Sequence, residues 1–287
     1  MRALLLGVRG STPASGADFV RYGGATSCVA VFDDRKGGGT GAGPALVLDA
    51  GTGLRTLTAV LGGRPYTGPI FLSHLHWDHV QGLPFFAAGD RADAAVDLYL
   101  PAQDAASGRD LLARSMSPPS FPIEPEGLLG QWSFTALEPG RRRVGALEVT
   151  AAEVPHKGGR TFGYRIDGEG GSLAYLPDHA PAPTCSVEVQ RLVEGVDLLL
   201  HDAQFLEPER RLADAYGHAT VQDAVDLAVR CGVGTLVLFH HSPTRTDDAL
   251  DDIAARTTAP LPVVVAREGS SIDVRPRGRT GQPTGDR

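Results

Sequence analysis

The sequence predicts an α/β fold in which two β-sheets pack face to face and helices cover both outer surfaces, a four-layer αββα sandwich. Short apolar runs of strand length, separated by glycine and proline, occur throughout both halves of the chain. In each half, segments with helical spacing of apolar residues follow the strands, and the order is similar without sequence repetition. Two sheets covered by helices would bury this pattern, and we expect one domain over residues 1–275.

The N-terminal half contains the first series of predicted strands. Five apolar runs predict strands, at residues 3–8, 27–32, 45–50, 69–73 and 97–100. The glycine-rich stretch at 36–44 has no side chains that could pack, which predicts a flexible hairpin tip. Residues 104–114 show helical spacing that ends before Pro118 and Pro119, which predicts a helix followed by a proline-rich loop.

The C-terminal half contains a second series of predicted strands and helices. Strands are predicted at 131–137, 145–152, 163–166, 173–176, 198–201, 235–241 and 262–266. Helices are predicted at 219–230, where the apolar residues share one face, and at 247–256. The basic run at 141–143 is expected in a solvated hairpin turn. Residues 276–287 have no apolar side chain to bury, which predicts a disordered tail.

The composition is that of a folded protein with a net negative charge. Of the 287 residues, 42% are hydrophobic, and 27 basic against 34 acidic residues leave a net charge of −7. This charge repels polyanions, so we expect neither extended nucleic-acid binding nor binding to a membrane surface. No apolar run reaches the roughly 18 residues of a membrane span. Three cysteines without CxxC spacing predict unpaired thiols and a cytoplasmic location. The sequence does not fix the oligomeric state, and a homodimer is possible.

The strongest chemical signal is the segment HLHWDH at residues 74–79, directly after a predicted strand. Three imidazoles and a carboxylate this close cannot all pair with one another, whereas borderline divalent metals bind both nitrogen and carboxylate oxygen. In an extended segment His74 and His76 point the same way, and Asp78 and His79 can turn toward a second centre. The segment therefore predicts two adjacent metal ions, with a solvated histidine-rich loop as the alternative.

With DAGTG upstream at 49–53, the HxHxDH pattern resembles the metallo-β-lactamase-fold hydrolases. The resemblance implies three more ligands at the ends of later strands, and His156, Asp178 and His240 fill those places. It implies a first metal held by His74, His76, His156 and Asp178, and a second held by Asp78, His79, Asp178 and His240. Asp178 would bridge the two metals, and Asp49 would hydrogen-bond the motif from outside the ligand set.

Two adjacent histidines compete for these places. His179 follows Asp178 and His241 follows His240, and neighbours on a strand point to opposite faces. His241 could therefore replace His240 as a ligand. Asp178 could instead serve only as a turn residue after its strand, where aspartate is common.

Three C-terminal motifs, LLLHDAQF at 198–205, YGHATVQDA at 216–224 and LVLFHHSP at 236–243, are similar to the ribonuclease Z branch. In that branch a carboxylate and a histidine work as a pair beside the metals, and the matching residues are Asp202 and His218. An imidazole held protonated by a carboxylate can protonate a departing sugar oxygen, so His218 is the predicted general acid. The predicted catalytic residues are Asp78, Asp202 and His218. The alternative for His218 is a helix cap, and His201 is expected to be structural.

Two departures from that branch bear on the substrate. Aspartate stands at 202 where the branch has glutamate, and Gln204 stands in place of threonine, which weakens the expected pairing with His218. The basic, glycine-rich arm with which ribonuclease Z proteins clamp tRNA has no counterpart between Asp178 and Asp202. Together with the net charge, this favours a small substrate over RNA.

The N-terminal stretch at 7–28 and the extended motif HLHWDHVQGLPFF at 74–86 resemble a bacterial subgroup of cyclic-nucleotide phosphodiesterase-like metallohydrolases. Arg9 and Arg21 in the first stretch could contact a phosphate. Four apolar side chains could form a pocket that stacks a base, although core packing explains the two phenylalanines of the motif equally well. These are Phe85, Phe86, Met116 and Phe121.

We therefore expect a dinuclear metal-dependent hydrolase of a small phosphodiester, such as a 3′,5′-cyclic nucleotide. The alternatives are an RNA 3′-end nuclease and an acyl hydrolase of lactones, lactams or thioesters, which would not need Asp202 and His218. A non-catalytic metal sensor is disfavoured because all seven ligand positions are filled. Five histidines and two aspartates suit two zinc ions, which we expect, and they also suit manganese or iron.

Overall fold

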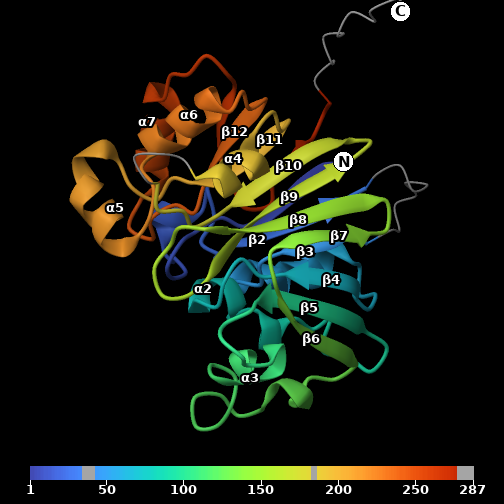
Figure 1. Cartoon of the computed structure of the whole chain (residues 1–287). Helices are drawn as coiled ribbons and strands as arrows, with labels where there is room; N and C mark the ends of the chain where they lie inside the picture. The colour runs from blue at the N-terminus through green and yellow to red at the C-terminus, as the bar shows by residue number, and fades with distance from the viewer. Residues whose placement is uncertain (34–42, 182–185, 277–287) are drawn as a thin grey trace, which may run out of the picture.

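Two β-sheets packed face to face form the centre of the molecule, with helices on their outer surfaces (Figure 1). This computed structural model describes residues 1–33, 43–181 and 186–276. The arrangement confirms the predicted four-layer αββα sandwich. The predicted hairpin tip at 36–44 and the predicted tail at 276–287 lie almost entirely outside the described residues.

The first sheet has the strand order β14-β1-β2-β3-β4-β5-β6. Its strands are β1 (Arg2–Gly7), β2 (Cys28–Phe32), β3 (Leu46–Leu48), β4 (Thr67–Phe71), β5 (Ala95–Pro101), β6 (Gln131–Leu137) and β14 (Ser271–Asp273). Strands β3 to β6 are parallel, whereas β14, β1, β2 and β3 pair antiparallel. The helical segments after its strands are η2 (Thr52–Thr56), α1 (Leu57–Val60), α2 (Trp77–Val80), η3 (Leu83–Phe85) and α3 (Gly108–Ala113).

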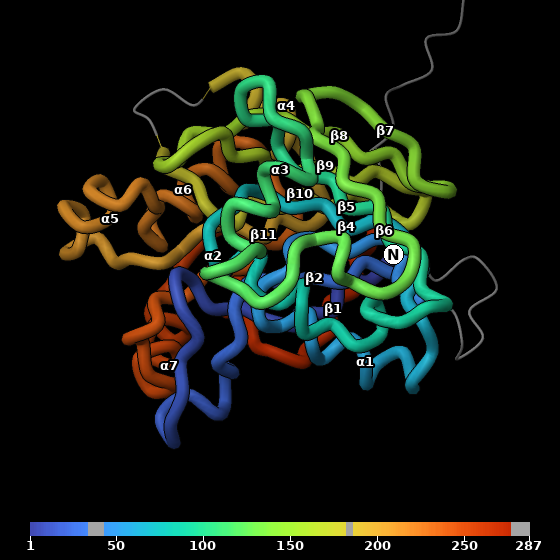
Figure 2. Tube along the Cα trace, turned by 90° about the horizontal axis from the view of Figure 1, so that it is seen from below, coloured from blue at the N-terminus to red at the C-terminus, as the bar shows by residue number. Residues whose placement is uncertain are grey.

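The second sheet has the order β13-β12-β11-β10-β9-β8-β7. Its strands are β7 (Gly140–Val144), β8 (Leu147–Val154), β9 (Thr161–Gly168), β10 (Gly171–Leu176), β11 (Leu198–Asp202), β12 (Thr235–Phe239) and β13 (Val263–Val265). Strands β10 to β13 are parallel. Its helices are α4 (Val187–Val193), α5 (Arg210–Tyr216), α6 (Val221–Arg230) and α7 (Asp247–Arg256). Of these, α5 stands away from the sheets in both Figure 1 and Figure 2.

Alternation along the strands explains the layers. In β10, Leu173 and Tyr175 join the core between the sheets, whereas Ala174 and Leu176 face the core beneath the helices. Because every residue of β10 is buried, both faces of this strand are apolar, as expected for a central parallel strand. The apolar face of α6 completes the outer core of the second sheet.

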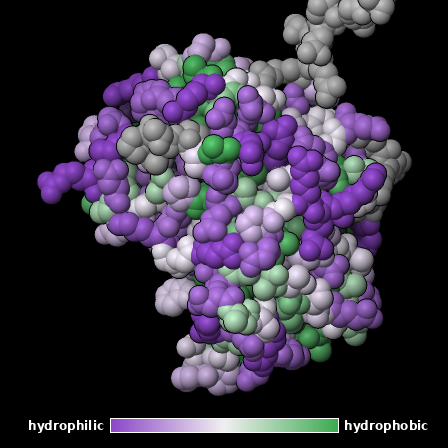
Figure 3. Space-filling view, in the orientation of Figure 1, coloured by the Kyte–Doolittle hydropathy of each residue, from purple (hydrophilic) through white to green (hydrophobic). Residues whose placement is uncertain are grey.

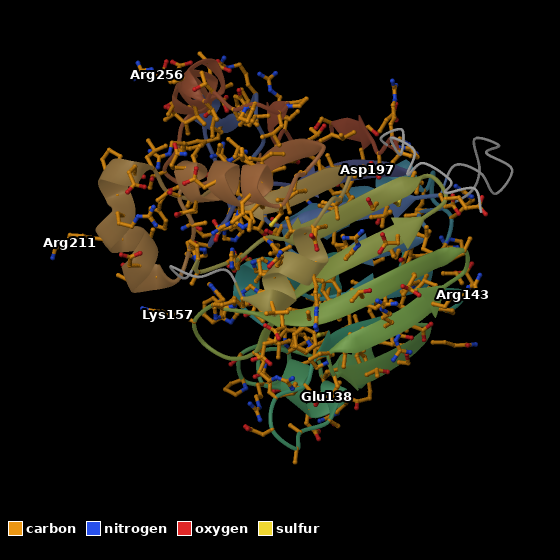
Figure 4. All side chains as sticks on the ribbon, turned by 45° about the horizontal axis from the view of Figure 1, so that its top comes forward. Glu138, Arg143, Lys157, Asp197, Arg211 and Arg256 are labelled. Atoms are coloured by element: carbon orange, nitrogen blue, oxygen red, sulfur yellow. The ribbon has the colours of Figure 1, made fainter. Side chains whose placement is uncertain are left out.

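The basic run at 141–143 lies in the edge strand β7 rather than in a turn, so that prediction was wrong. Arg142 packs its guanidinium over the Tyr99 ring, 4.5 Å from the centroid, and Arg143 lies at the outer edge of the sheet (Figure 4). Long basic side chains keep an edge strand solvated and deter further strand pairing, which is why such a sequence can form one. The sequence analysis also missed α4, α5 and β14.

Polar residues follow the carboxyl ends of five strands. They are Asp49 after β3, the 74–79 segment after β4, Asp178 after β10, Asp202 at the end of β11 and His240 after β12. Strands β3 and β4 are parallel in the first sheet, and β10, β11 and β12 are parallel in the second. Parallel strands of one sheet end on the same side, so the residues that follow them lie close together. This end of the sandwich is where the predicted site residues meet.

No helix in the described parts of the chain is long and apolar enough to cross a membrane. The face seen in Figure 3 is mostly hydrophilic, with small and scattered hydrophobic spots.

Candidate metal centre

The 74–79 segment is positioned by the end of β4 and the start of α2. The backbone is still extended at His76, so His74 and His76 lie two residues apart on one side, and the single turn of α2 places Asp78 and His79 beside them. Gly51 allows the DAGTG turn to lie directly against α2, because a Cβ there would be 2.2 Å from the Asp78 carbonyl oxygen. His74, Asp78 and His79 are all buried.

The first group of potential ligands comprises His74, His76, His156 and Asp178. His74 Nε2 lies 2.8 Å from His76 Nδ1 and 3.7 Å from Asp178 Oδ2. His156 Nε2 lies 3.4 Å from His76 Nδ1 and 3.5 Å from Asp178 Oδ2. His156 Nδ1 lies 2.7 Å from the Gly217 carbonyl oxygen, and donating to that oxygen leaves Nε2 as the ligand atom.

The second group comprises Asp78, His79 and His240, and it meets the other oxygen of Asp178. Asp178 Oδ1 lies 3.1 Å from His79 Nε2 and 3.1 Å from His240 Nε2. Asp78 Oδ2 lies 3.2 Å from the same two nitrogens. Asp178 therefore presents one carboxylate oxygen to each group.

The residues of both groups fit bound cations. Among the described residues, His79 Nε2 and Asp178 Oδ1 are buried without a hydrogen-bond partner although they face each other. Buried polar atoms are normally satisfied, so a pair of unsatisfied atoms aimed at one point indicates a missing ligand. Imidazole nitrogen together with carboxylate oxygen is the donor set of borderline divalent metals.

The electrostatics of the cluster also favour cations. Burial lowers the pKa of His74, His76 and His156, which keeps these imidazoles in the neutral form that binds metals. Burial opposes a charge on His79, but the carboxylates around it raise its pKa well above the ordinary value. Burial likewise opposes ionisation of Asp178, and the neighbouring histidines lower its pKa well below the usual range. Three neutral imidazoles, those of His74, His76 and His156, thus face ionised carboxylates, an arrangement that suits bound cations.

Asp49 holds the histidine segment from behind. Its carboxylate accepts hydrogen bonds from the Ser73 amide at 2.6 Å, the Ser73 hydroxyl at 2.8 Å and the Tyr175 hydroxyl at 2.8 Å. The same carboxylate lies 2.7 Å from His79 Nδ1, which aims His79 Nε2 at Asp178. A carboxylate behind a histidine ligand orients the ring and increases its basicity.

Asp202 and His218 form a buried pair beside the cluster. Asp202 Oδ2 lies 2.8 Å from His218 Nδ1, so the shorter aspartate still reaches the imidazole. The backbone amides of His179, Gln204 and Ala219 also donate to the Asp202 carboxylate. Burial opposes a charge on His218, but Asp202 raises its pKa to about 9.

His218 is placed by the loop before α6 and does not cap that helix. The N-cap is Thr220, whose hydroxyl accepts from the Asp223 amide. His218 Nδ1 lies 3.8 Å from Asp178 Oδ2, and its ring stacks on His240 with centroids 5.2 Å apart. The predicted pair therefore lies directly against the ligand cluster.

The competing histidines point elsewhere. His241 Nε2 lies 2.9 Å from the Ala266 carbonyl oxygen, on the opposite side of the chain from His240. His179 Nδ1 lies 2.9 Å from His201 Nε2, and His201 Nδ1 lies 2.7 Å from the Asp202 carbonyl oxygen. These three histidines serve the packing around the site.

Arg9 and Arg21 have structural contacts rather than a place in the cluster. Arg9 is fully buried and donates to the carbonyl oxygens of Gly23, Ser242 and Arg245. Arg21 forms ion pairs with aspartates of α7, namely Asp248 and Asp251. Both arginines fasten the N-terminal loop to the C-terminal part of the chain.

The sequence analysis missed contacts from the N-terminal loop to the cluster. The Ser11 amide donates to Asp78 Oδ2 at 2.6 Å, and Gln204 Nε2 donates to the Ser11 hydroxyl at 3.2 Å. Gly10 lies so close to His240 that a Cβ would be 2.3 Å from its Nδ1. Glycine and serine are too common after strands for the sequence to predict these contacts. The hydrogen bond from Tyr175 to Asp49 was also not predicted, because a tyrosine in an apolar strand looks like an ordinary core residue.

A four-layer sandwich that gathers histidines and aspartates at the ends of its strands defines a metal-dependent hydrolase of the metallo-β-lactamase fold. The chain belongs to the beta-lactamase superfamily, whose domain model matches residues 46–241. The chain is a metal-dependent hydrolase, and relatives named ribonuclease Z match it over most of its length.

Relatives over almost the whole chain support this placement. Ribonuclease Z of Haloarcula marismortui is 25% identical, and the match covers 94% of this chain and 95% of that protein. A metallo-beta-lactamase fold protein of Bacillus subtilis superposes with a TM-score of 0.69 at 19% identity, over 94% of this chain and 98% of that one. The short form of human tRNase Z superposes with a TM-score of 0.66 at 20% identity, over 96% and 99% of the two chains.

The expectation that the chain binds no extended nucleic acid was wrong. Relatives named ribonuclease Z act on RNA, which is an extended nucleic acid. The expectation of no nucleic-acid binding relied on the net charge of −7, which is a sum over all residues of the chain. Binding of a polyanion depends on the local field around the site, which the sum does not describe.

Replacing Asp49 with asparagine should weaken metal binding without removing a ligand. The amide has one acceptor atom in place of two, so it cannot hold Ser73, Tyr175 and His79 together. We expect metal affinity to fall by about 10- to 100-fold, measured by chelator competition. Tyr175→Phe keeps the carboxylate and should have a much smaller effect. Unchanged affinity in the asparagine variant would contradict this role of Asp49.

Proposed function

We propose that the two groups of side chains hold two divalent cations, with Asp178 shared between them. The first would be held by His74, His76, His156 and Asp178, and the second by Asp78, His79, Asp178 and His240. Bound there, such ions supply Lewis acidity that activates water and neutralises charge on phosphoryl oxygens. The nitrogen-rich donor set supports zinc as their identity, which metal analysis of the purified protein can test.

The hydrogen-bonded pair of Asp202 and His218 is the main support for cleavage of a phosphodiester. After attack on phosphorus the departing sugar oxygen needs a proton, and a protonated imidazole is suited to give it. Asp202 engages His218 Nδ1 and leaves Nε2 as the atom that donates the proton. Hydrolysis of a thioester on the same scaffold has no such requirement, because a thiolate can leave without being protonated.

We propose that the substrate is a small nucleotide phosphodiester such as a 3′,5′-cyclic nucleotide. Support comes from the phosphodiesterase-like motifs at 7–28 and 74–86, and from the short connection between β10 and α4, at residues 177–186. Cleavage at the 3′ end of an RNA is the second candidate, and the relatives named ribonuclease Z favour it. The cytoplasm is the proposed location.

A substrate panel on metal-loaded protein separates these functions. The proposal expects cyclic nucleotides to be hydrolysed faster than lactones or thioesters. Cleavage of a pre-tRNA that falls steeply with added salt, at rates above those on cyclic nucleotides, would establish the second candidate instead. Higher rates on lactones than on any phosphodiester would overturn both.

Asp178→Ala should abolish activity and release at least one metal ion, because both groups lose a carboxylate oxygen. The measurement is metal content by elemental analysis after gel filtration. Two full equivalents retained by the variant would rule out Asp178 as the shared ligand.

His240→Ala should lose the second metal, whereas His241→Ala should keep both. The two histidines are adjacent, but only His240 faces Asp78 and Asp178. His241 contacts the Ala266 carbonyl oxygen, so its removal should lower the melting temperature rather than the metal content. The reverse pattern of metal loss would exchange their roles.

His218→Ala should discriminate between leaving groups. Cleavage of a natural ribose ester should slow by about 100-fold or more, because an alkoxide leaving group needs protonation. Hydrolysis of a nitrophenyl phosphodiester should change little, since the activated leaving group needs almost none, and metal content should stay the same. Asp202→Asn should show the same substrate dependence with a smaller loss. Equal losses on both substrates would mean that His218 only positions the substrate or supports the fold.

A further inference from the structure

A groove with an aromatic wall lies against α2, the helix that carries the candidate ligands Asp78 and His79. It has a volume of about 340 Å³ and lies between the α2–η3 segment and the loop after α3. Its lining includes Trp77, Phe85, Arg114, Met116 and Phe121. Trp77 lies in the chain directly between His76 and Asp78, so one end of the groove is joined to the ligand segment itself.

The exposure of two of these aromatic side chains is not explained by core packing. Three aromatic residues of the described chain are strongly exposed, Trp77 at 74%, Phe85 at 57% and Tyr216 at 61%, and two of them line this one groove. The neighbouring Phe86 is fully buried and packs on Tyr66, with ring centroids 5.4 Å apart. The motif therefore places one phenylalanine in the core and leaves the other at the surface. Clustered exposed apolar side chains mark binding sites.

Cationic side chains adjoin the aromatic wall. Arg114 lines the groove, and a second cavity of about 540 Å³ shares Gln81 and Phe85 with it. That second cavity contains Arg55, an exposed residue whose side chain makes no hydrogen bond or ion pair with another described residue. Guanidinium groups beside flat aromatic faces suit a ligand that carries both a base and a phosphate.

We propose that this groove binds the nucleobase of the substrate, stacked on Trp77 and Phe85. The proposal rests on the proposed phosphodiesterase function and names its substrate class as nucleotide esters. Phe121 meets Phe85 edge to face at 6.1 Å and supports the stacking face. Every base has a π-face, so the groove would favour a nucleoside over a baseless ester without selecting one base strongly. Of the four residues that the sequence suggested for such a pocket, Phe85, Met116 and Phe121 line it, whereas Phe86 does not.

Intrinsic fluorescence tests the groove without relying on catalysis. The chain has two tryptophans, and the other one, Trp132, is half-buried and donates to the carbonyl oxygens of Gly89 and Leu129. Adenosine monophosphate should quench metal-loaded protein, whereas ribose 5-phosphate, which has the same phosphate and no base, should not. Trp77→Phe should abolish the quenching. Equal quenching by both ligands, or quenching that survives in Trp77→Phe, would overturn the proposal.

Kinetics on a matched pair of substrates tests the same subsite. Thymidine 5′-(4-nitrophenyl) phosphate and methyl 4-nitrophenyl phosphate share the scissile bond and leaving group, but only the first carries a sugar and a base. Trp77→Leu should reduce kcat/KM for the thymidine ester by about tenfold to hundredfold, mainly through KM, and should leave the methyl ester nearly unchanged. Trp77→Phe keeps an aromatic face and should retain most of the preference. Tyr216→Leu, at an exposed aromatic outside the groove, should leave the ratio of the two rates unchanged.

The two proposals fail in different ways. Equal losses on both esters in Trp77→Leu, at unchanged metal content, would overturn the base subsite and leave the phosphodiesterase function in place. If neither ester were hydrolysed while lactones were, the proposed function would fall, and the base-dependent quenching would still report on the groove.

Discussion

The structure around the site depends on one buried carboxylate, Asp178. It stands at the end of the fully buried strand β10, and each of its oxygens faces a different cluster of imidazoles. An isolated carboxylate at such a depth would cost several kcal/mol. Histidines surround it on both sides, and cations held by these residues would balance its charge. The Asp178 carboxylate is surrounded by histidines from the end of β4, from the loop after β8 and from the end of β12.

Two further buried carboxylates give this centre its geometry. Asp49 fixes the histidine segment from the first sheet, and Asp202 fixes His218 from the second. Each is held by donors from its own surroundings, Asp49 by Ser73 and Tyr175 and Asp202 by three backbone amides. The candidate metal ligands and His218 are therefore oriented by carboxylates at the ends of strands. The groove beside Trp77 lies on shorter helical turns and a loop.

Much of this could be predicted from the sequence, because strands and ligand motifs have local patterns. Short apolar runs located most strands, and the cluster at 74–79 predicted metal chemistry independently of the fold. Segments with weak local signals were missed: the edge strand with Arg141 to Arg143 looks like a solvated turn, and the helices α4 and α5 are each only seven residues long. Contacts made only in three dimensions, such as Ser11 to Asp78 and Tyr175 to Asp49, have no local signal at all. The whole-chain charge misled the expectation about nucleic acids because it says nothing about where the charges lie.

Anomalous diffraction from crystals of the zinc-loaded protein can show whether two cations share Asp178. Two anomalous peaks are expected at the strand ends, each about 2.0–2.2 Å from a different oxygen of Asp178. One peak should also lie beside His74, His76 and His156, and the other beside Asp78, His79 and His240. A single peak, or peaks that leave Asp178 without a bond to metal, would rule out Asp178 as a shared ligand.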